Sequence, residues 1–411
     1  MNIMKFIFRL VKSFLVVVIL YLYIYNPPFT FLPISASKLL YIILLPYFLF
    51  NRQISKTYFT FFSKETLLLG FIISYSFIVE LLNSIPNRVY SYANLYMLFE
   101  NFFFAFSIAY FLFKHYKNSI DNVLLTVTGI AALITLYLII NPEINLIVRQ
   151  FVLQTDDVAL KMMHRSFGIS DSLTFAYAIV QGIAAAICFT KIKNIFWSSL
   201  LFLLYLVSAA FNARIGMLPI FAILFYMLFV EKKYSKVLGS ITCLLVLLLF
   251  FLNTKLAVDY EDTLEWITDF FTEISSLIMG TETASNSNMD ILLNDMVVLP
   301  RTFGEWILGS GIDLYTSPVR NSDVGYFIQL NYGGLFYILL FALLVLFLFH
   351  KLLKYKVPEK WFTFLFIVVI LTCSYKGLFL VTNPGFRMLM LLYFCYFLRT
   401  VLKYNRIRNE I

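Results

Sequence analysis

Long apolar stretches recur along the whole sequence, and short polar segments separate them. An α-helix needs about 20 apolar residues to cross the hydrocarbon core of a membrane. Hydrophobic side chains make up 61% of the 411 residues and charged ones only 13%, whereas about a quarter of an ordinary globular domain is charged. The pattern therefore predicts an all-α polytopic integral membrane protein.

The apolar stretches predict about twelve transmembrane helices. Their expected ranges are 11–25, 33–50, 65–83, 93–113, 122–140, 173–190, 195–211, 215–230, 237–253, 324–349, 361–380 and 386–402.

The basic residues indicate how these helices are oriented. If the N-terminus is cytoplasmic, most of the 32 Lys and Arg residues fall on cytoplasmic connections. Cytoplasmic loops of membrane proteins carry such an excess, so both termini are predicted to be cytoplasmic. The net charge of +9 is then a signal of topology, and no nucleic-acid partner is expected.

Residues 1–411 are interpreted as a single transmembrane domain with two long external loops, 141–172 and 254–323. Loops of that length are uncommon unless they are functional or disordered. In the larger loop, between the ninth and tenth spans, apolar residues three and four apart predict an amphipathic helix over 259–278. A second helix is expected before Pro300. The loop is interpreted either as a structural cap or as a lid over an outward-facing site.

Several kinds of active site are excluded by missing motifs. The chain has no Walker GxxxxGK[ST] sequence for ATP and no GxSxG sequence for a hydrolase nucleophile, and "GSGIDL" lacks the third glycine of a dinucleotide loop. The four cysteines lie inside predicted spans without CxxC spacing, and there are only three histidines. No metal and no cofactor are expected.

Cationic side chains are predicted at the external membrane boundary. One interpretation is that each long side chain only places its charged end at the membrane–water interface. The other is phosphate binding, because arginine presents a planar fork that matches phosphate oxygens. Arg214 is the most informative, because it lies in a very short connection beside Asn212. If these cations converge, they suit the diphosphate of a lipid-linked substrate. The cationic residues predicted at this boundary are Arg165, Arg214, Arg320, Lys376 and Arg387.

Two carboxylates, Glu80 and Glu100, are predicted inside spans. Charged groups at membrane depth are costly and tend to mark function. Glu100 is expected to lie within reach of an external cavity. Either a proton-coupled role or a structural pairing with an arginine or asparagine would explain such residues.

Four short motifs occur in a characteristic order: "HRSFGISDS", "FNARIGML", "ILGSGIDLYTS" and "NSDVGYFIQLNYGGLFYILL". Together with the spans and the large loop, they resemble the O-antigen and capsule repeat-unit polymerases of bacteria (Wzy), which share a superfamily with the O-antigen ligases. The resemblance covers most of 160–390. It implies a GT-C-like, metal-independent glycosyltransferase in the bacterial inner membrane whose active site faces outward.

The resemblance implies a reaction between two polyprenyl-diphosphate-linked glycans, a donor and an acceptor, in the lipid bilayer. A chain-length regulator and a flippase are possible protein partners. Functional arginines of the family carry over to Arg165, Arg214 and Arg320, with His164 as a secondary candidate.

The attacking sugar hydroxyl benefits from a carboxylate acceptor. Asp323 is the first candidate and Asp313 the second. Asp323 is also expected to cap the following helix, and the adjacent Asn321 and Ser322 are further capping candidates.

Two other functions stay open. One is a ligase that transfers finished glycan to lipid A core. The ligase branch has His-Asn where this chain has Ser322-Asp323 followed by Gly325, which favours a polymerase. The other is a flippase for lipid-linked oligosaccharides, a class that tends to show internal symmetry and short loops.

Overall fold

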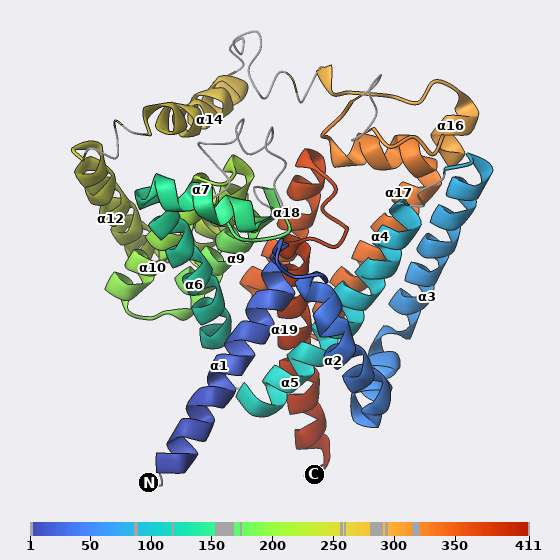
Figure 1. Cartoon of the computed structure of the whole chain (residues 1–411), viewed down its shortest axis with the longest axis horizontal. Coiled ribbons are helices and arrows are strands. Elements are labelled where there is room, and N and C mark those ends of the chain that lie inside the picture. The colour runs from blue at the N-terminus through green and yellow to red at the C-terminus, as the bar shows by residue number, and fades with distance from the viewer. Residues whose placement is uncertain are drawn as a thin grey trace. The chain divides into compact units, whose positions relative to one another are not determined.

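The computed structural model describes residues 3–85, 89–116, 119–152, 168–172, 175–254, 258, 260–279, 291, 295–314 and 321–409. Over these residues the regular structure is helical (Figure 1), and the only β-type pairing in them is an isolated bridge between Phe29 and Val152. The predicted all-α fold class is therefore confirmed for the described part of the chain.

The chain forms two compact units. Unit 1 comprises residues 1–47, 111–267 and 383–389, and unit 2 comprises 48–110, 268–382 and 390–411. In chain order the helices are α1 (Ile3–Tyr25), α2 (Ala36–Phe50), α3 (Arg52–Leu82), α4 (Val89–Met97), the π-helix η1 (Leu98–Phe104), α5 (Ala105–Tyr116), α6 (Ile120–Ile140), α7 (Pro142–Phe151), α9 (Phe175–Lys191), α10 (Ile195–Ala210), the 3₁₀ turn η2 (Arg214–Gly216), α11 (Met217–Phe225), the π-helix η3 (Tyr226–Val230), α12 (Tyr234–Leu252), α14 (Glu261–Met279), α16 (Phe303–Leu308), α17 (Gly325–Lys354), α18 (Lys360–Lys376) and α19 (Pro384–Asn409).

A helix occupies each of the twelve predicted apolar stretches. By length and composition, five helical segments of the described chain could cross a membrane, which is consistent with a helical membrane protein. The count of twelve spans and their orientation stay predictions. The five segments are Arg52–Leu82, Val89–Tyr116, Ile120–Ile140, Gly325–Lys354 and Pro384–Leu402.

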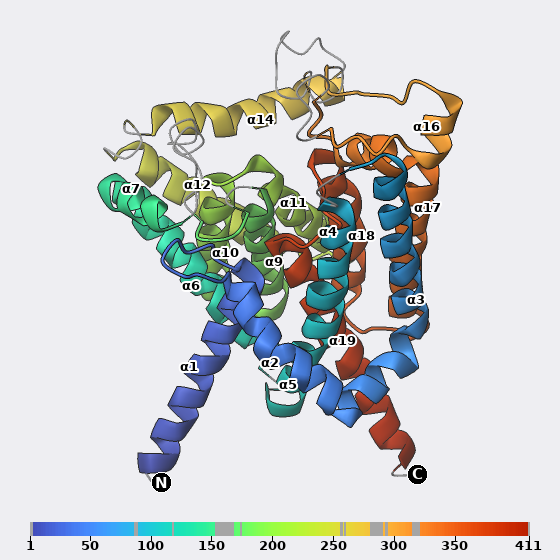
Figure 2. The same cartoon turned by 45° about the vertical axis from the view of Figure 1, so that its right-hand side comes forward.

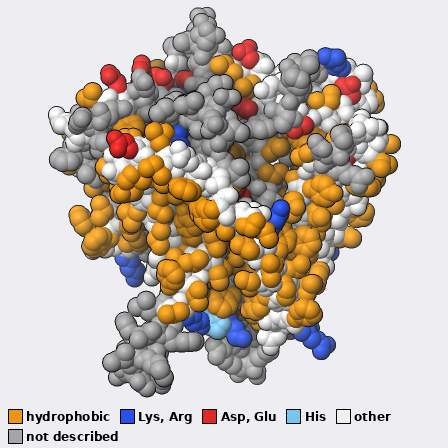
Figure 3. All heavy atoms as spheres, viewed as in Figure 1, with side chains coloured by type: hydrophobic (Ala, Val, Ile, Leu, Met, Phe, Trp, Pro, Cys, Tyr) orange, Lys and Arg blue, Asp and Glu red, His pale blue; other side chains and the backbone are white. Residues whose placement is uncertain are grey.

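Large apolar side chains are exposed on the outer faces of these helices. On α3, Leu67, Phe71 and Leu81 are each more than half exposed, and hydrophobic side chains cover much of the face shown in Figure 3. Soluble monomers rarely expose contiguous apolar patches larger than a few hundred Å². This surface fits contact with lipid.

Helix α9 forms the centre of unit 1. It packs against α6, α10 and α11, and α10 lies beside it in both ribbon views (Figures 1 and 2). Small residues let the helices approach closely: a Cβ on Gly182 would lie 2.2 Å from the carbonyl oxygen of Gly216. Close approach through small residues is how helices associate where the hydrophobic effect is absent.

In unit 2, α3 packs against both α4 and α17. Buried polar side chains join the three helices, since the Asn94 side chain donates to Ser76 at 2.7 Å and to the Tyr337 hydroxyl at 2.8 Å. Helix α17 has a kink at Gly334, whose φ of +69° favours glycine. The Tyr75 hydroxyl on α3 donates to the Gly333 carbonyl beside this kink.

The structure tests the helices predicted in 254–323. Helix α14 confirms the amphipathic helix predicted over 259–278. Of the helix expected before Pro300, Ile291 and Asp295 are described as helical and 297–300 are not, and α16 begins after that proline. The Thr302 side chain accepts the Glu305 N–H and caps the start of α16.

Candidate functional site

Arg214 lies in a rigid turn of unit 1 between α10 and α11. The preceding Asn212 is fully buried; its side chain donates to the Ser208 carbonyl at 2.8 Å and accepts the Gly168 N–H at 3.0 Å. The turn packs tightly on α9, since a Cβ on Gly216 would lie 2.6 Å from the Ala178 carbonyl oxygen. Arg214 itself is only 9% exposed. A guanidinium is thus held at a helix connection by a backbone with little freedom to move.

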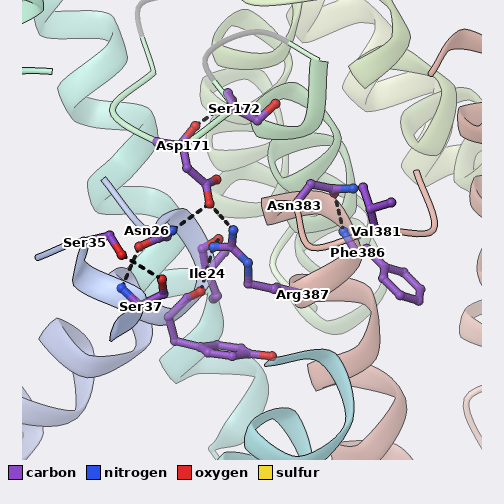
Figure 4. A network of polar contacts seen from close by, with 12 residues as sticks. Ile24, Asn26, Ser35, Ser37, Asp171, Ser172, Val381, Asn383, Phe386 and Arg387 are labelled. Carbon is purple, nitrogen blue, oxygen red and sulfur yellow. Dashed lines mark hydrogen bonds and ion pairs between the residues drawn. The ribbon is translucent and has the colours of Figure 1, made fainter. Parts of the chain in front are cut away.

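Arg387 is buried in unit 1 near the start of α19, and Figure 4 shows its surroundings. Its guanidinium donates to the carbonyls of Tyr23 (3.1 Å) and Ile24 (2.9 Å) and forms an ion pair with Asp171. Asn26 donates to the same carboxylate oxygen at 2.8 Å. These contacts bring the end of α1, the 168–172 segment and α19 together.

The Asp171–Arg387 pair combines two opposing electrostatic effects. Burial raises the pKa of the Asp171 carboxyl above its ordinary value of 3.8, and the guanidinium and the Asn26 amide oppose that shift. Sequence reasoning missed Asp171 as a partner, although it lies within the "HRSFGISDS" motif. Arg387 was predicted to bind a diphosphate, and in this structure its charge is partnered within the protein.

Asp323 and Lys376 lie together in unit 2. Their charged atoms are 3.6 Å apart, and each side chain is a little over one third exposed. The prediction that Asp323 caps α17 is wrong: Val324 holds the cap position without a side-chain cap bond, and the Ser322 hydroxyl, rather than Asp323, accepts the Val324 N–H at 3.1 Å.

Asp313, the second candidate acid, is also in unit 2. It is half-buried, and its carboxylate accepts a hydrogen bond from the Tyr90 hydroxyl at 2.9 Å. The ring of Tyr90 stacks on Tyr332 with centroids 3.9 Å apart.

Glu100 lies in η1 and is 5% exposed. That Glu100 lies within reach of an external cavity stays a prediction. A π-helix inserts an extra residue into a helix and often occurs at functional sites. The next residue, Asn101, donates to the Val381 carbonyl at 3.3 Å within the same unit.

The predicted convergence of the arginines stays a prediction. His164, Arg165 and Arg320 lie outside the described residues. Of the remaining predicted residues, Arg214 and Arg387 belong to unit 1, and Asp313, Asp323 and Lys376 to unit 2.

Among the described side chains, no group of three or more His, Cys, Asp or Glu residues could hold a metal ion. No protein-family model matches the sequence, and no curated protein is significantly similar to it.

Proposed function

We propose that this chain polymerises lipid-linked oligosaccharide repeats on the outer face of a bacterial inner membrane. The growing glycan on one polyprenyl diphosphate is transferred to a sugar hydroxyl of the next lipid-linked repeat. The product is surface polysaccharide, either O-antigen or capsule, and polyprenyl diphosphate is released. A flippase and a chain-length regulator would act with it.

The observation that carries the proposal is the burial of Arg214 in a fixed turn between apolar helices. The leaving diphosphate is already a stable anion, so its departure needs cations more than a strong acid. A guanidinium offers two parallel donors to phosphate oxygens. Arg165 and Arg320, which the motif resemblance assigns to the same role, would complete the cation set.

Extension of a synthetic polyprenyl-diphosphate-linked repeat by the purified protein tests this function. We expect a ladder of longer glycans and release of the lipid diphosphate. A ligase would extend nothing without a lipid A core acceptor. A flippase would move the lipid across a vesicle bilayer without joining glycans.

Substitution of Arg214 tests its part in the reaction. We expect Arg214→Gln to lower the extension rate by about 10² to 10³, the usual effect of removing one preorganised charge-stabilising donor. Arg149→Gln is a matched control, because Arg149 is buried in unit 1 and lies outside the motifs. If a folded Arg214→Gln protein extends at the wild-type rate, Arg214 does not stabilise the leaving group.

A further inference from the structure

The exposed face of α3 changes character near a bend in the helix. The backbone of Phe62 departs from helical geometry, and the helix turns there (Figure 2). Before the bend, the exposed side chains include Arg52 and Lys56. Beyond the bend they become mainly apolar, with Leu67 64% and Phe71 59% exposed. On a helix that contacts lipid, such a change marks the level where the hydrocarbon core gives way to the polar headgroups.

Helix α17 shows the same change at its C-terminal end. Its outer face exposes apolar side chains such as Leu346, whereas Lys354, in the last turn, exposes a cation. The two helices meet at this level, because the ring of Phe61 on α3 lies 5.8 Å from the ring of Tyr355, the residue that follows α17. Both helices of unit 2 therefore place the headgroup level at the same contact.

The acidic residues at this end of unit 2 are buried and already paired. Segments 52–66 and 346–360 contain two of them. Glu65 is 1% exposed and forms an ion pair with Lys351, and Glu359 is 8% exposed and lies 3.2 Å from Arg399. The exposed Lys, Arg, Asp and Glu side chains of the two segments are consequently all cations. They are Arg52, Lys56, Lys64, Lys354, Lys356 and Lys360.

Lys64 and Lys354 lie close to the Lys351 ammonium, near enough for their charges to act on it. Within the described chain, neither forms an ion pair with a carboxylate, although the Lys354 ammonium lies 5.8 Å from the centre of the Tyr355 ring. Three ammonium groups thus share one nearby carboxylate, that of Glu65. Like charges at short range repel one another, so this cluster favours a bound anion.

Exposed aromatic rings adjoin the cations. Phe59 lies one turn after Lys56 and is 46% exposed, and Phe50 at the end of α2 is 85% exposed. The ring of Phe48 lies 6.1 Å from that of Phe59, which brings the end of α2 beside the start of α3. A free inorganic anion covers none of this apolar surface, whereas the acyl chains of a phospholipid remove it from water. The surface therefore fits a lipid better than a soluble anion.

We propose that Lys64 and Lys354 bind the phosphate of an anionic phospholipid at this end of unit 2. Their ammonium groups donate charge-assisted hydrogen bonds to phosphate oxygens, and Arg52 and Lys56 add to the attraction. In the predicted orientation the lipid belongs to the cytoplasmic leaflet. The phosphate also reduces the repulsion acting on Lys351, so the bound lipid stabilises the contact between α3 and α17. This inference is independent of the proposed polymerase activity.

Lipid binding to the detergent-solubilised full chain tests the inference. Native mass spectrometry counts the bound lipids as dioleoyl phosphatidylglycerol is added, and dioleoyl phosphatidylcholine, with the same acyl chains and no net charge, is the comparison. We expect wild type to prefer phosphatidylglycerol. The double variant Lys64→Gln/Lys354→Gln should bind it about 25-fold more weakly, at about fivefold for each cation removed, with its affinity for phosphatidylcholine unchanged. Equal binding of the two lipids by wild type overturns the inference.

A matched double variant controls for net charge. Lys38→Gln/Lys193→Gln removes two exposed lysines of unit 1 and should keep the wild-type preference. The conservative Lys64→Arg/Lys354→Arg variant should keep it as well, because it retains both charges. If the two glutamine variants lose the same affinity, net charge rather than a local site explains the binding.

Thermal unfolding provides a second readout. Phosphatidylglycerol should raise the melting midpoint of wild type more than that of Lys64→Gln/Lys354→Gln, and salt should weaken the effect by screening. An equal rise in both proteins overturns the assignment of these two lysines. Inorganic phosphate at the same concentration should leave the bound lipid in place, and its displacement of the lipid would show that the site takes a soluble anion.

Discussion

Loss of the Arg387 side chain should destabilise unit 1 strongly. In Arg387→Ala, the carbonyls of Tyr23 and Ile24 lose a donor, and the Asp171 carboxylate loses its cationic partner. Breaking a buried ion pair by removing one partner costs about 3 to 5 kcal/mol. Unit 1 is of the size at which 1 kcal/mol shifts the melting midpoint by about 2 to 4 °C, so we expect a fall of about 6 to 20 °C.

Thermal unfolding of the detergent-solubilised protein, followed by the fluorescence of its four tryptophans, measures this shift. Lys233→Ala is the control, because Lys233 pairs with Glu231 in the same unit with its side chain about half exposed. Exposed pairs contribute about 0 to 1 kcal/mol. Equal midpoints for the two variants would show that the buried pair does not stabilise the fold.

A double-mutant cycle isolates the pair itself. Asp171→Asn removes the charge while keeping an acceptor oxygen, and it should cost less than Arg387→Ala. In the double variant no carboxylate is left without its cation, so the loss should be smaller than the sum of the single losses by about 0.5 to 3 kcal/mol. Strict additivity would contradict a direct interaction between the two side chains.

Two further predictions concern packing. Gly309→Ala should lower the melting midpoint, because the left-handed backbone and the contact with the Tyr332 carbonyl together cost at least about 1 to 3 kcal/mol. Gly70→Ala on α3 is the control: nothing lies within 4 Å of an added Cβ there, so the midpoint should stay equal or rise. Asn212→Ala should lower the midpoint by removing the acceptor of the Gly168 N–H and the donor to Ser208, at about 1 to 3 kcal/mol. Asn212→Asp keeps the acceptor but buries a carboxylate against the Ser208 carbonyl, so it should cost at least as much, and a smaller loss would refute this account.

Local patterns predicted the helices well, because helical periodicity and apolar length are properties of neighbouring residues. Each predicted apolar stretch contains a helix, and α14 lies where the spacing of its apolar residues indicated. The error at Asp323 arose where three capping residues, Asn321, Ser322 and Asp323, are adjacent. Only the three-dimensional structure decided that Thr302 caps α16 and that Ser322, rather than Asp323, accepts the Val324 N–H.

The sequence by itself determined the helical membrane character of this protein and the chemical types of its candidate site residues. Their partners depend on tertiary structure, because Arg387 and Asp171 are 216 residues apart in the chain and Tyr90 and Asp313 are 223 apart. No local pattern connects residues at such separations. Packing of the helices alone decided that Arg387 joins Asp171, that Lys376 joins Asp323, and that Asp313 is held by a buried tyrosine.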